Sequence, residues 1–165
     1  MLNNKKIFDV ITPLHTTHRM SKPLRDGGKY MDVDTVPGMW VKLTVDGVVG
    51  TRTAAGSGYS ALCLSAYKDG TTGAGQYESN DTRGGSITVI VEPGVVARAG
   101  SFYFGANFDT VVIGDLLSVY STVGIDDDQV GKLRKAVTGT DIANAIVIDR
   151  TDDYVEYMII TPKAA

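Results

Sequence analysis

The sequence predicts an all-β protein, either a small β-barrel or a β-sandwich, with an extended N-terminal arm and at most one short helix. Three observations support this fold class. Short apolar runs recur from residue 37 onward, glycine, proline and aspartate separate them, and a single segment has helical spacing. Roughly nine such runs with turn residues between them are typical of sandwiches and barrels. The length of 165 residues favours one domain.

The first 36 residues differ from the rest in texture. Their apolar residues are sparse and unpatterned, and turn-forming residues interrupt them at Pro13, Pro23 and Gly27-Gly28. We therefore predict an arm over residues 1–36 and a β domain over residues 37–165. Such an arm is easiest to explain if it has a partner to lie on, and its removal is expected to leave the β domain folded.

The first predicted strand covers residues 39–45. Its residues alternate between two faces, with Trp40 on the face opposite Val41. Asp46-Gly47 then predicts a two-residue hairpin turn, because both positions tolerate positive φ, and residues 48–53 return as the partner strand. Trp40 is interpreted either as an interface residue or as the residue that holds the arm down.

Further strands are expected at residues 59–67, 86–92, 95–97, 101–104, 115–121, 143–148 and 154–160. The last two are expected to form a closing hairpin, and residues 71–85 a long polar loop. The helical candidate is residues 127–137, where Val130, Leu133 and Val137 have helical spacing but Gly131 weakens the pattern. A short helical turn and an irregular loop both remain open there.

Composition limits the classes of function. The formal net charge of -3 gives no electrostatic signal for nucleic acid or an anionic membrane surface. No window approaches the ~20 apolar residues that a membrane-spanning helix needs, so a soluble protein is expected. The single cysteine, Cys63, lies in a mostly apolar run, which favours a buried thiol, and the lack of a disulfide framework fits a reducing cytosol.

Motifs for catalysis or metal binding are weak. His15 and His18 form His-x-x-His, but no nearby cysteine completes a tetrahedral set, so contact with a partner is the preferred interpretation and no metal is expected. The consecutive acids Asp126-Asp127-Asp128 do not have the alternating spacing of a calcium loop. No nucleophile elbow, phosphate-binding loop or dinucleotide-binding turn is present. The sequence therefore predicts neither an enzyme nor a cofactor.

Four segments resemble the capsid decoration (cement) proteins of tailed bacteriophages. They are Pro37-Gly-Met-Trp-Val-Lys-Leu-Thr-Val-Asp-Gly47, Ile113-Gly-Asp-Leu-Leu-Ser-Val-Tyr120, Ala143-Asn-Ala-Ile-Val-Ile148 and Tyr154-Val-Glu-Tyr-Met-Ile-Ile160. The resemblance covers most of residues 37–160 and rests on ordinary strand and turn residues. It implies a β-tulip-like domain that binds the outside of a phage head and stabilises the lattice of the major capsid protein. It also implies assembly in the host cytoplasm and self-association, with a homotrimer preferred over a dimer.

The resemblance directs attention to the arm as the contact with the capsid. An extended segment can cross a subunit boundary and add strand pairing or pocket contacts, and arginines can pair with capsid carboxylates. The expected partner-binding residues are Ile7, Phe8, His15, His18, Arg19, Arg25 and Trp40. Three alternatives stay open: a head-fibre or tail component, a carbohydrate-binding module that uses loop 70–85 and Tyr77, and an enzyme with an unrecognised site.

Overall fold

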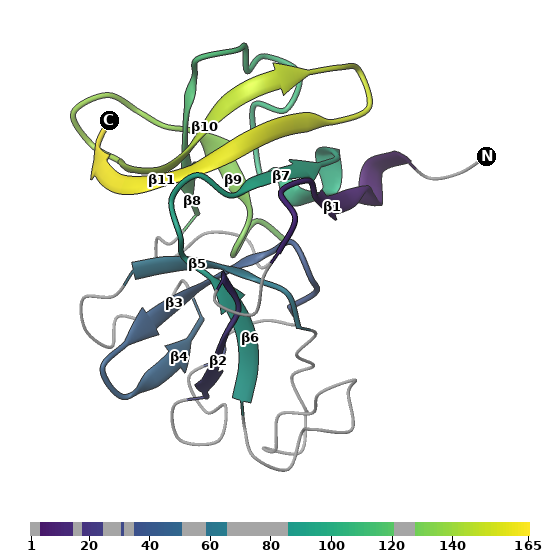
Figure 1. Cartoon of the computed structure of the whole chain (residues 1–165). Helices are drawn as coiled ribbons and strands as arrows, with labels where there is room; N and C mark the ends of the chain where they lie inside the picture. Colours follow the sequence, from purple (N-terminus) through teal and green to yellow (C-terminus); the bar gives the residue numbers. More distant parts are fainter. Residues whose placement is uncertain are drawn as a thin grey trace.

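The computed structural model describes residues 4–14, 18–24, 31, 35–50, 59–65, 86–120 and 128–165. Within these residues the protein is built from two antiparallel β-sheets, seen in the upper and lower halves of Figure 1. The prediction of an all-β fold is confirmed, and the arrangement is sandwich-like rather than a closed barrel. The helical elements among the described residues are two short 3₁₀ turns, η1 (Asn4–Lys6) and η5 (Ser101–Tyr103).

Sheet A contains six strands in the order β1-β7-β11-β10-β8-β9. Their bounds are β1 Phe8–Val10, β7 Val96–Ala99, β8 Leu116–Val119, β9 Leu133–Lys135, β10 Ile142–Arg150 and β11 Val155–Ala164. The hairpin of β10 and β11 contains the two longest strands of this sheet and crosses the upper half of Figure 1. The predicted closing hairpin is therefore confirmed.

Sheet B contains five strands in the order β2-β6-β5-β3-β4. Their bounds are β2 Met20–Pro23, β3 Trp40–Thr44, β4 Gly47–Val49, β5 Tyr59–Cys63 and β6 Ser86–Ile90. Leu24, just after β2, forms an isolated parallel bridge with Val48 of β4. Sheet B is therefore curled, and its two edge strands approach one another.

Two hydrophobic clusters follow from the alternation along the strands of sheet B. Trp40, Leu62 and Ile90 point toward sheet A and join the larger cluster, which also holds Tyr157 from β11. Their neighbours on the opposite face belong to the smaller cluster: Leu24, Met31, Val41, Val48, Ala61, Cys63, Ile87 and Val89. Both faces of this sheet are thus buried, because successive side chains of a strand point to opposite sides.

The segment predicted as an arm supplies one edge strand to each sheet. β1 pairs with β7 in sheet A, and β2 pairs with β6 in sheet B. The carbonyl of Ile7 accepts a hydrogen bond of 2.8 Å from the amide of Gly100, and the Phe8 ring lies 5.6 Å from that of Tyr103. The division of the chain at residue 36 stays a prediction, but these described parts of residues 1–36 pack on the β domain itself.

The first hairpin forms as predicted, but its turn is displaced by one residue. Thr44 pairs with Gly47, so Val45 and Asp46 occupy the tip instead of Asp46 and Gly47. The Thr44 hydroxyl donates to the carbonyl of Gly47 at 2.8 Å and accepts from the amide of Asp46 at 3.3 Å. Gly47 has φ +125°, which glycine adopts without a steric cost. The local hydrogen bonds of Thr44 therefore set the register.

One strand prediction is wrong, and the segment left open between a helical turn and a loop contains a strand. Residues 101–103 form the 3₁₀ turn η5 rather than a strand. The helical candidate 127–137 contains a turn at residues 128–131 followed by strand β9, in which Leu133 pairs with Val119 and Lys135 with Leu117. Gly131 at φ +74° interrupts any helix, and pairing with β8 then decides the conformation.

Candidate functional site

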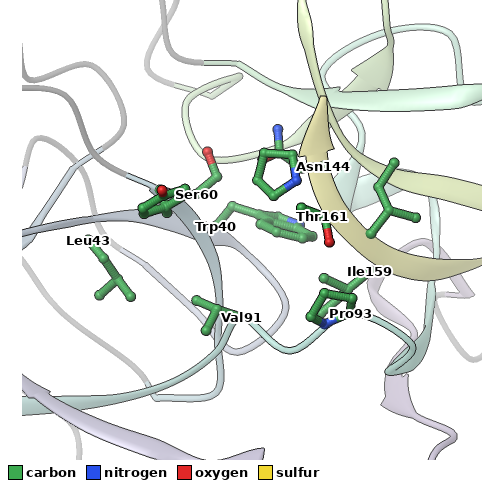
Figure 2. Close-up of a pocket in the computed structure, with 11 residues that line it drawn as sticks. Trp40, Leu43, Ser60, Val91, Pro93, Asn144, Ile159 and Thr161 are labelled. Carbon is green, nitrogen blue, oxygen red and sulfur yellow. The ribbon is translucent and has the colours of Figure 1, made fainter. Parts of the chain in front are cut away.

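An apolar cavity of about 260 Å³ opens where the two sheets meet. In Figure 2 the Trp40 side chain lies at the centre of the lining, between Ser60 and the strand that carries Ile159 and Thr161. The full lining is Trp40, Leu43, Tyr59, Ser60, Val91, Pro93, Asn144, Ile159, Ile160, Thr161 and Pro162. Sheet B thus provides one wall, and the hairpin of sheet A the other.

A β-bulge in the hairpin shapes this cavity. Ala143 pairs with Lys163 and Ala145 with Ile159, so Asn144 alone stands opposite residues 160–162. Such bulges bend a strand and redirect its side chains, and they occur often beside functional sites. Pro162 has no N–H for the ladder, which suits an irregular position. The bulge therefore places Asn144 and residues 160–162 around one opening.

Trp40 forms the floor of the cavity and is a core residue. It is 2% exposed, its ring lies 6.3 Å from that of Tyr157, and its amide donates to the carbonyl of Gly131 at 2.8 Å. The alternation of β3 turns Trp40 toward sheet A and buries it in the larger cluster, and its contact with a partner stays a prediction. Figure 2 shows it between the two walls.

Two buried polar atoms accompany this packing. Trp40 Nε1 and the Tyr157 hydroxyl are both buried, and neither forms a hydrogen bond of regular geometry within the described residues. Burial raises the pKa of the Tyr157 hydroxyl, while the neighbouring indole N–H of Trp40 acts in the opposite direction. The contact between the two sheets thus contains polar atoms whose burial opposes its stability.

A polar cavity of about 510 Å³ adjoins the apolar one. Both are lined by Tyr59, Ser60, Asn144 and Pro162, so they form two halves of one groove. We call this the inter-sheet groove. Lys42, Arg134 and Asp141 are the charged residues that line its polar half.

The single carboxylate of the groove is engaged by the protein. Asp141 Oδ1 accepts from Arg134 Nη2 at 2.7 Å, and Oδ2 accepts from Ser118 Oγ at 3.1 Å and the amide of Val137 at 2.7 Å. Among the described residues no ion pair is formed by Lys42. The groove lining therefore has one more positive than negative charge.

A second notable surface is the turn at residues 112–115. Val112 and Ile113 are 58% and 65% exposed. Asp115 Oδ2 accepts from the amide of Val112 at 2.9 Å and from Lys135 Nζ at 2.9 Å, while the amide of Gly114 donates to Val147 O at 2.8 Å. Burial acts to raise the pKa of Asp115, but the hydrogen bonds from Lys135 and Val112 outweigh it and the pKa is lowered. An ionised carboxylate thus fixes the turn that presents two apolar side chains.

Of the predicted arm residues that the structure describes, Phe8 and Arg19 line one cavity, whereas His18 lies beside Glu92. Ile7 and Phe8 are half-buried, and the Phe8 side chain packs on the larger cluster. Arg19 is exposed and lines, with Phe8, a cavity of about 450 Å³. His18 Nε2 lies 3.4 Å from Glu92 Oε2, beside the pairing of β2 with β6. His15 and Arg25 lie outside the described residues, as do Asp126, Asp127, Tyr77 and loop 70–85.

The described residues contain neither a candidate metal-binding cluster nor a candidate membrane-spanning helix. There, no three His, Cys, Asp or Glu side chains gather into a group that could hold a metal ion. No helix in this part of the chain has the length and apolar character to cross a bilayer. No family model, curated protein or solved structure matches the chain significantly.

Sequence reasoning missed the inter-sheet groove. Its residues come from strands far apart in the chain, and Tyr59, Asn144 and Arg134 carry no motif. One signal was available: Pro162 lies two residues after the predicted strand 154–160, and proline near a strand indicates an edge or a bulge.

Proposed function

We propose that this protein is a structural virion component that binds the outer surface of a phage capsid and stabilises the lattice of the major capsid protein. Two independent lines support the proposal. The sequence segments described above resemble capsid decoration proteins, which suggests the partner. The rigid apolar turn at residues 112–115 suggests the mode of action, which is docking through a preformed surface.

The turn is the observation that carries the docking role. Exposed apolar side chains that form a contiguous patch often mark an interaction site. Here the hydrogen bonds of Asp115 hold the backbone in the conformation that exposes Val112 and Ile113. A surface fixed before binding loses little conformational entropy when it docks.

The N-terminal segment provides a second expected contact. Because β1 and β2 are fixed as edge strands, Arg19 between them is an exposed cation on an anchored backbone. An arginine in that position can pair with a capsid carboxylate in a bidentate manner. The protein would then lie on the capsid exterior after assembly in the host cytoplasm, and we expect a homotrimer, as the resemblance implies.

The decisive experiment measures binding to capsids of the encoding virus assembled without this protein. Wild type is expected to sediment with the particles and to raise the temperature at which they release DNA. Val112→Ser and Ile113→Ser are expected to weaken binding by about tenfold or more, as at interface anchor residues. Val45→Ser is the matched control, since Val45 is a fully exposed valine at the tip of the β3–β4 turn.

Two outcomes would contradict the proposal. If wild-type protein stays in the supernatant at every concentration, the capsid is not its partner. If Ile113→Ser and Val112→Ser bind capsids as tightly as Val45→Ser does, the turn is not the docking surface. Circular dichroism of each variant separates lost docking from lost folding.

A further inference from the structure

We propose that the inter-sheet groove binds an extended peptide segment of a partner protein, with one apolar side chain in the apolar half and an acidic side chain in the polar half. This function goes beyond docking through the turn at residues 112–115, and it does not depend on the partner being a capsid. The proposal rests on the size of the cavity, its polar lining and its charge.

The size of the apolar half favours a side chain over a larger ligand. Small-molecule and cofactor sites commonly measure roughly 300–1,000 Å³. The apolar cavity, at about 260 Å³, lies below that range. Its lining by Trp40, Val91, Pro93 and Ile159 suits an aliphatic or aromatic group. One apolar side chain is therefore the occupant that suits this half, and the adjoining polar half, at about 510 Å³, has room for the neighbouring residues of a peptide.

The Asn144 side chain in the lining has spare hydrogen-bonding capacity. Asn144 is 6% exposed, and the one hydrogen bond that its side chain makes within the described part of the chain runs from Nδ2 to Ile142 O at 3.1 Å. Asn144 lines both halves of the groove. A peptide backbone crossing from one half to the other would meet this amide.

The charge of the polar half selects the second side chain. Lys42 and Arg134 line it together with one carboxylate, Asp141, whose two oxygens already accept hydrogen bonds from Arg134, Ser118 and Val137. An added carboxylate would be attracted by the surplus positive charge, and an added ammonium group repelled. The partner segment therefore carries Asp or Glu a few residues from its apolar anchor.

Tyr59 connects the two halves at the mouth of the groove. It is 68% exposed although it lines both cavities, and Ile142, which lines the polar half, is 55% exposed. Exposed aromatic side chains beside a preformed pocket are common anchors for bound peptides. Removing the Tyr59 ring is therefore expected to weaken binding with little effect on folding.

Trp40 gives a direct test, because it is the single tryptophan of the chain and forms the floor of the cavity. The probes are short capped peptides that combine an anchor (Phe, Leu or Ala) with Asp, Asn or Lys two or three residues later. Titration into the full-length protein is followed by Trp40 fluorescence. Peptides that combine a Phe or Leu anchor with Asp are expected to bind at least about tenfold more tightly than peptides with an Ala anchor or with Lys in place of Asp.

Variants of the protein complete the design. Tyr59→Ala is expected to weaken binding of the Phe–Asp peptide by about tenfold. Val45→Ala, at another exposed apolar position that does not line the groove, is expected to leave it unchanged. Lys42→Ala is expected to lower the affinity for the Phe–Asp peptide about threefold, and the effect should be smaller at high salt. Lys22→Ala is its control, since Lys22 is also a half-buried lysine of sheet B but does not line the groove.

Several results would overturn the inference. These are the absence of any fluorescence response, equal binding of Ala and Phe peptides, or unchanged affinity in both Tyr59→Ala and Lys42→Ala. If sedimentation shows self-association that Tyr59→Ala abolishes, the occupant is a second copy of the chain instead. If Tyr59→Ala still binds capsids, the proposed capsid function does not depend on the groove and is retained. If the protein binds the peptides but not capsids, the groove proposal is retained and the capsid proposal is contradicted.

Discussion

The rings of Trp40 and Tyr157 lie 6.3 Å apart at an interplanar angle of 39° and join sheet B to sheet A. Both side chains are at least 98% buried, and both carry a polar atom without a regular hydrogen bond in the described structure. Aromatic burial stabilises this contact, whereas burial of the two polar atoms opposes it. Trp40 of this pair also forms the floor of the inter-sheet groove.

Replacing each member of this pair should therefore have different effects. Tyr157→Phe removes a hydroxyl that makes no regular hydrogen bond, so the free energy of unfolding should change by less than about 1 kcal/mol. Trp40→Ala leaves a large cavity and should cost about 3–5 kcal/mol. Urea unfolding followed by circular dichroism measures both. A loss of more than about 2 kcal/mol in Tyr157→Phe would show that the hydroxyl is strongly hydrogen-bonded.

Substitution of Gly38 should reveal how tightly the N-terminal segment is packed. Gly38 has φ +101°, and an added Cβ would lie 2.7 Å from the rings of Phe8 and Tyr103. Gly94 has φ +93° with open space around it. Gly94→Ala should thus cost only the backbone strain, about 1–2 kcal/mol, and Gly38→Ala about 1–3 kcal/mol more. Equal thermal unfolding midpoints for the two variants would argue against close packing at Phe8.

Deletion of residues 2–24 should impair folding of the remaining chain, contrary to the expectation for a separate arm. The deletion removes β1 from sheet A and β2 from sheet B, and it exposes the edges of β7 and β6. Unpaired edge strands promote aggregation. Size-exclusion chromatography should show aggregates or unfolded protein. A monodisperse product with a cooperative unfolding transition near that of the wild type would establish that the segment is dispensable for folding.

Alkaline pH should destabilise the protein through its buried acids. Burial raises the pKa of Cys63 to about 12, partly opposed by a hydrogen bond with the backbone of Ser65, whereas an unfolded thiol ionises at about 8.5. Between these values the unfolded chain has lost a proton that the folded chain keeps. The unfolding free energy should therefore fall by up to about 1.4 kcal/mol per pH unit above pH ~8.5. Tyr157, whose pKa is also raised, adds to this loss above pH ~10.

Cys63→Ala should remove the loss of stability that begins above pH ~8.5 and retain the loss that Tyr157 causes above pH ~10. Urea unfolding midpoints at neutral pH and in two alkaline buffers measure the difference. The native thiol should also resist iodoacetamide and react after denaturation, because the thiolate is the nucleophile. Rapid labelling of native protein would contradict the burial of Cys63.

The sequence determined by itself that this protein is all-β. Alternation in residues 39–45 and the apolar runs near the C-terminus predicted strands that the structure contains, because side chains of a strand with a buried face must alternate. The run around Cys63 likewise predicted a buried thiol, which the structure places in the smaller cluster. Local patterns of this kind reflect the environment of each residue without specifying its neighbours.

Only the tertiary structure decided which face each strand buries, and against what. Alternation separated Trp40 from Val41, but both faces of sheet B are covered, so Trp40 became the floor of a groove. Val130, Leu133 and Val137 have helical spacing, and residues 133–135 nevertheless form a strand, because they pair with the edge of β8. The bulge at Asn144 and the exposed turn at Ile113 also depend on long-range pairing. These features arise from contacts between residues distant in sequence, which local periodicity does not encode.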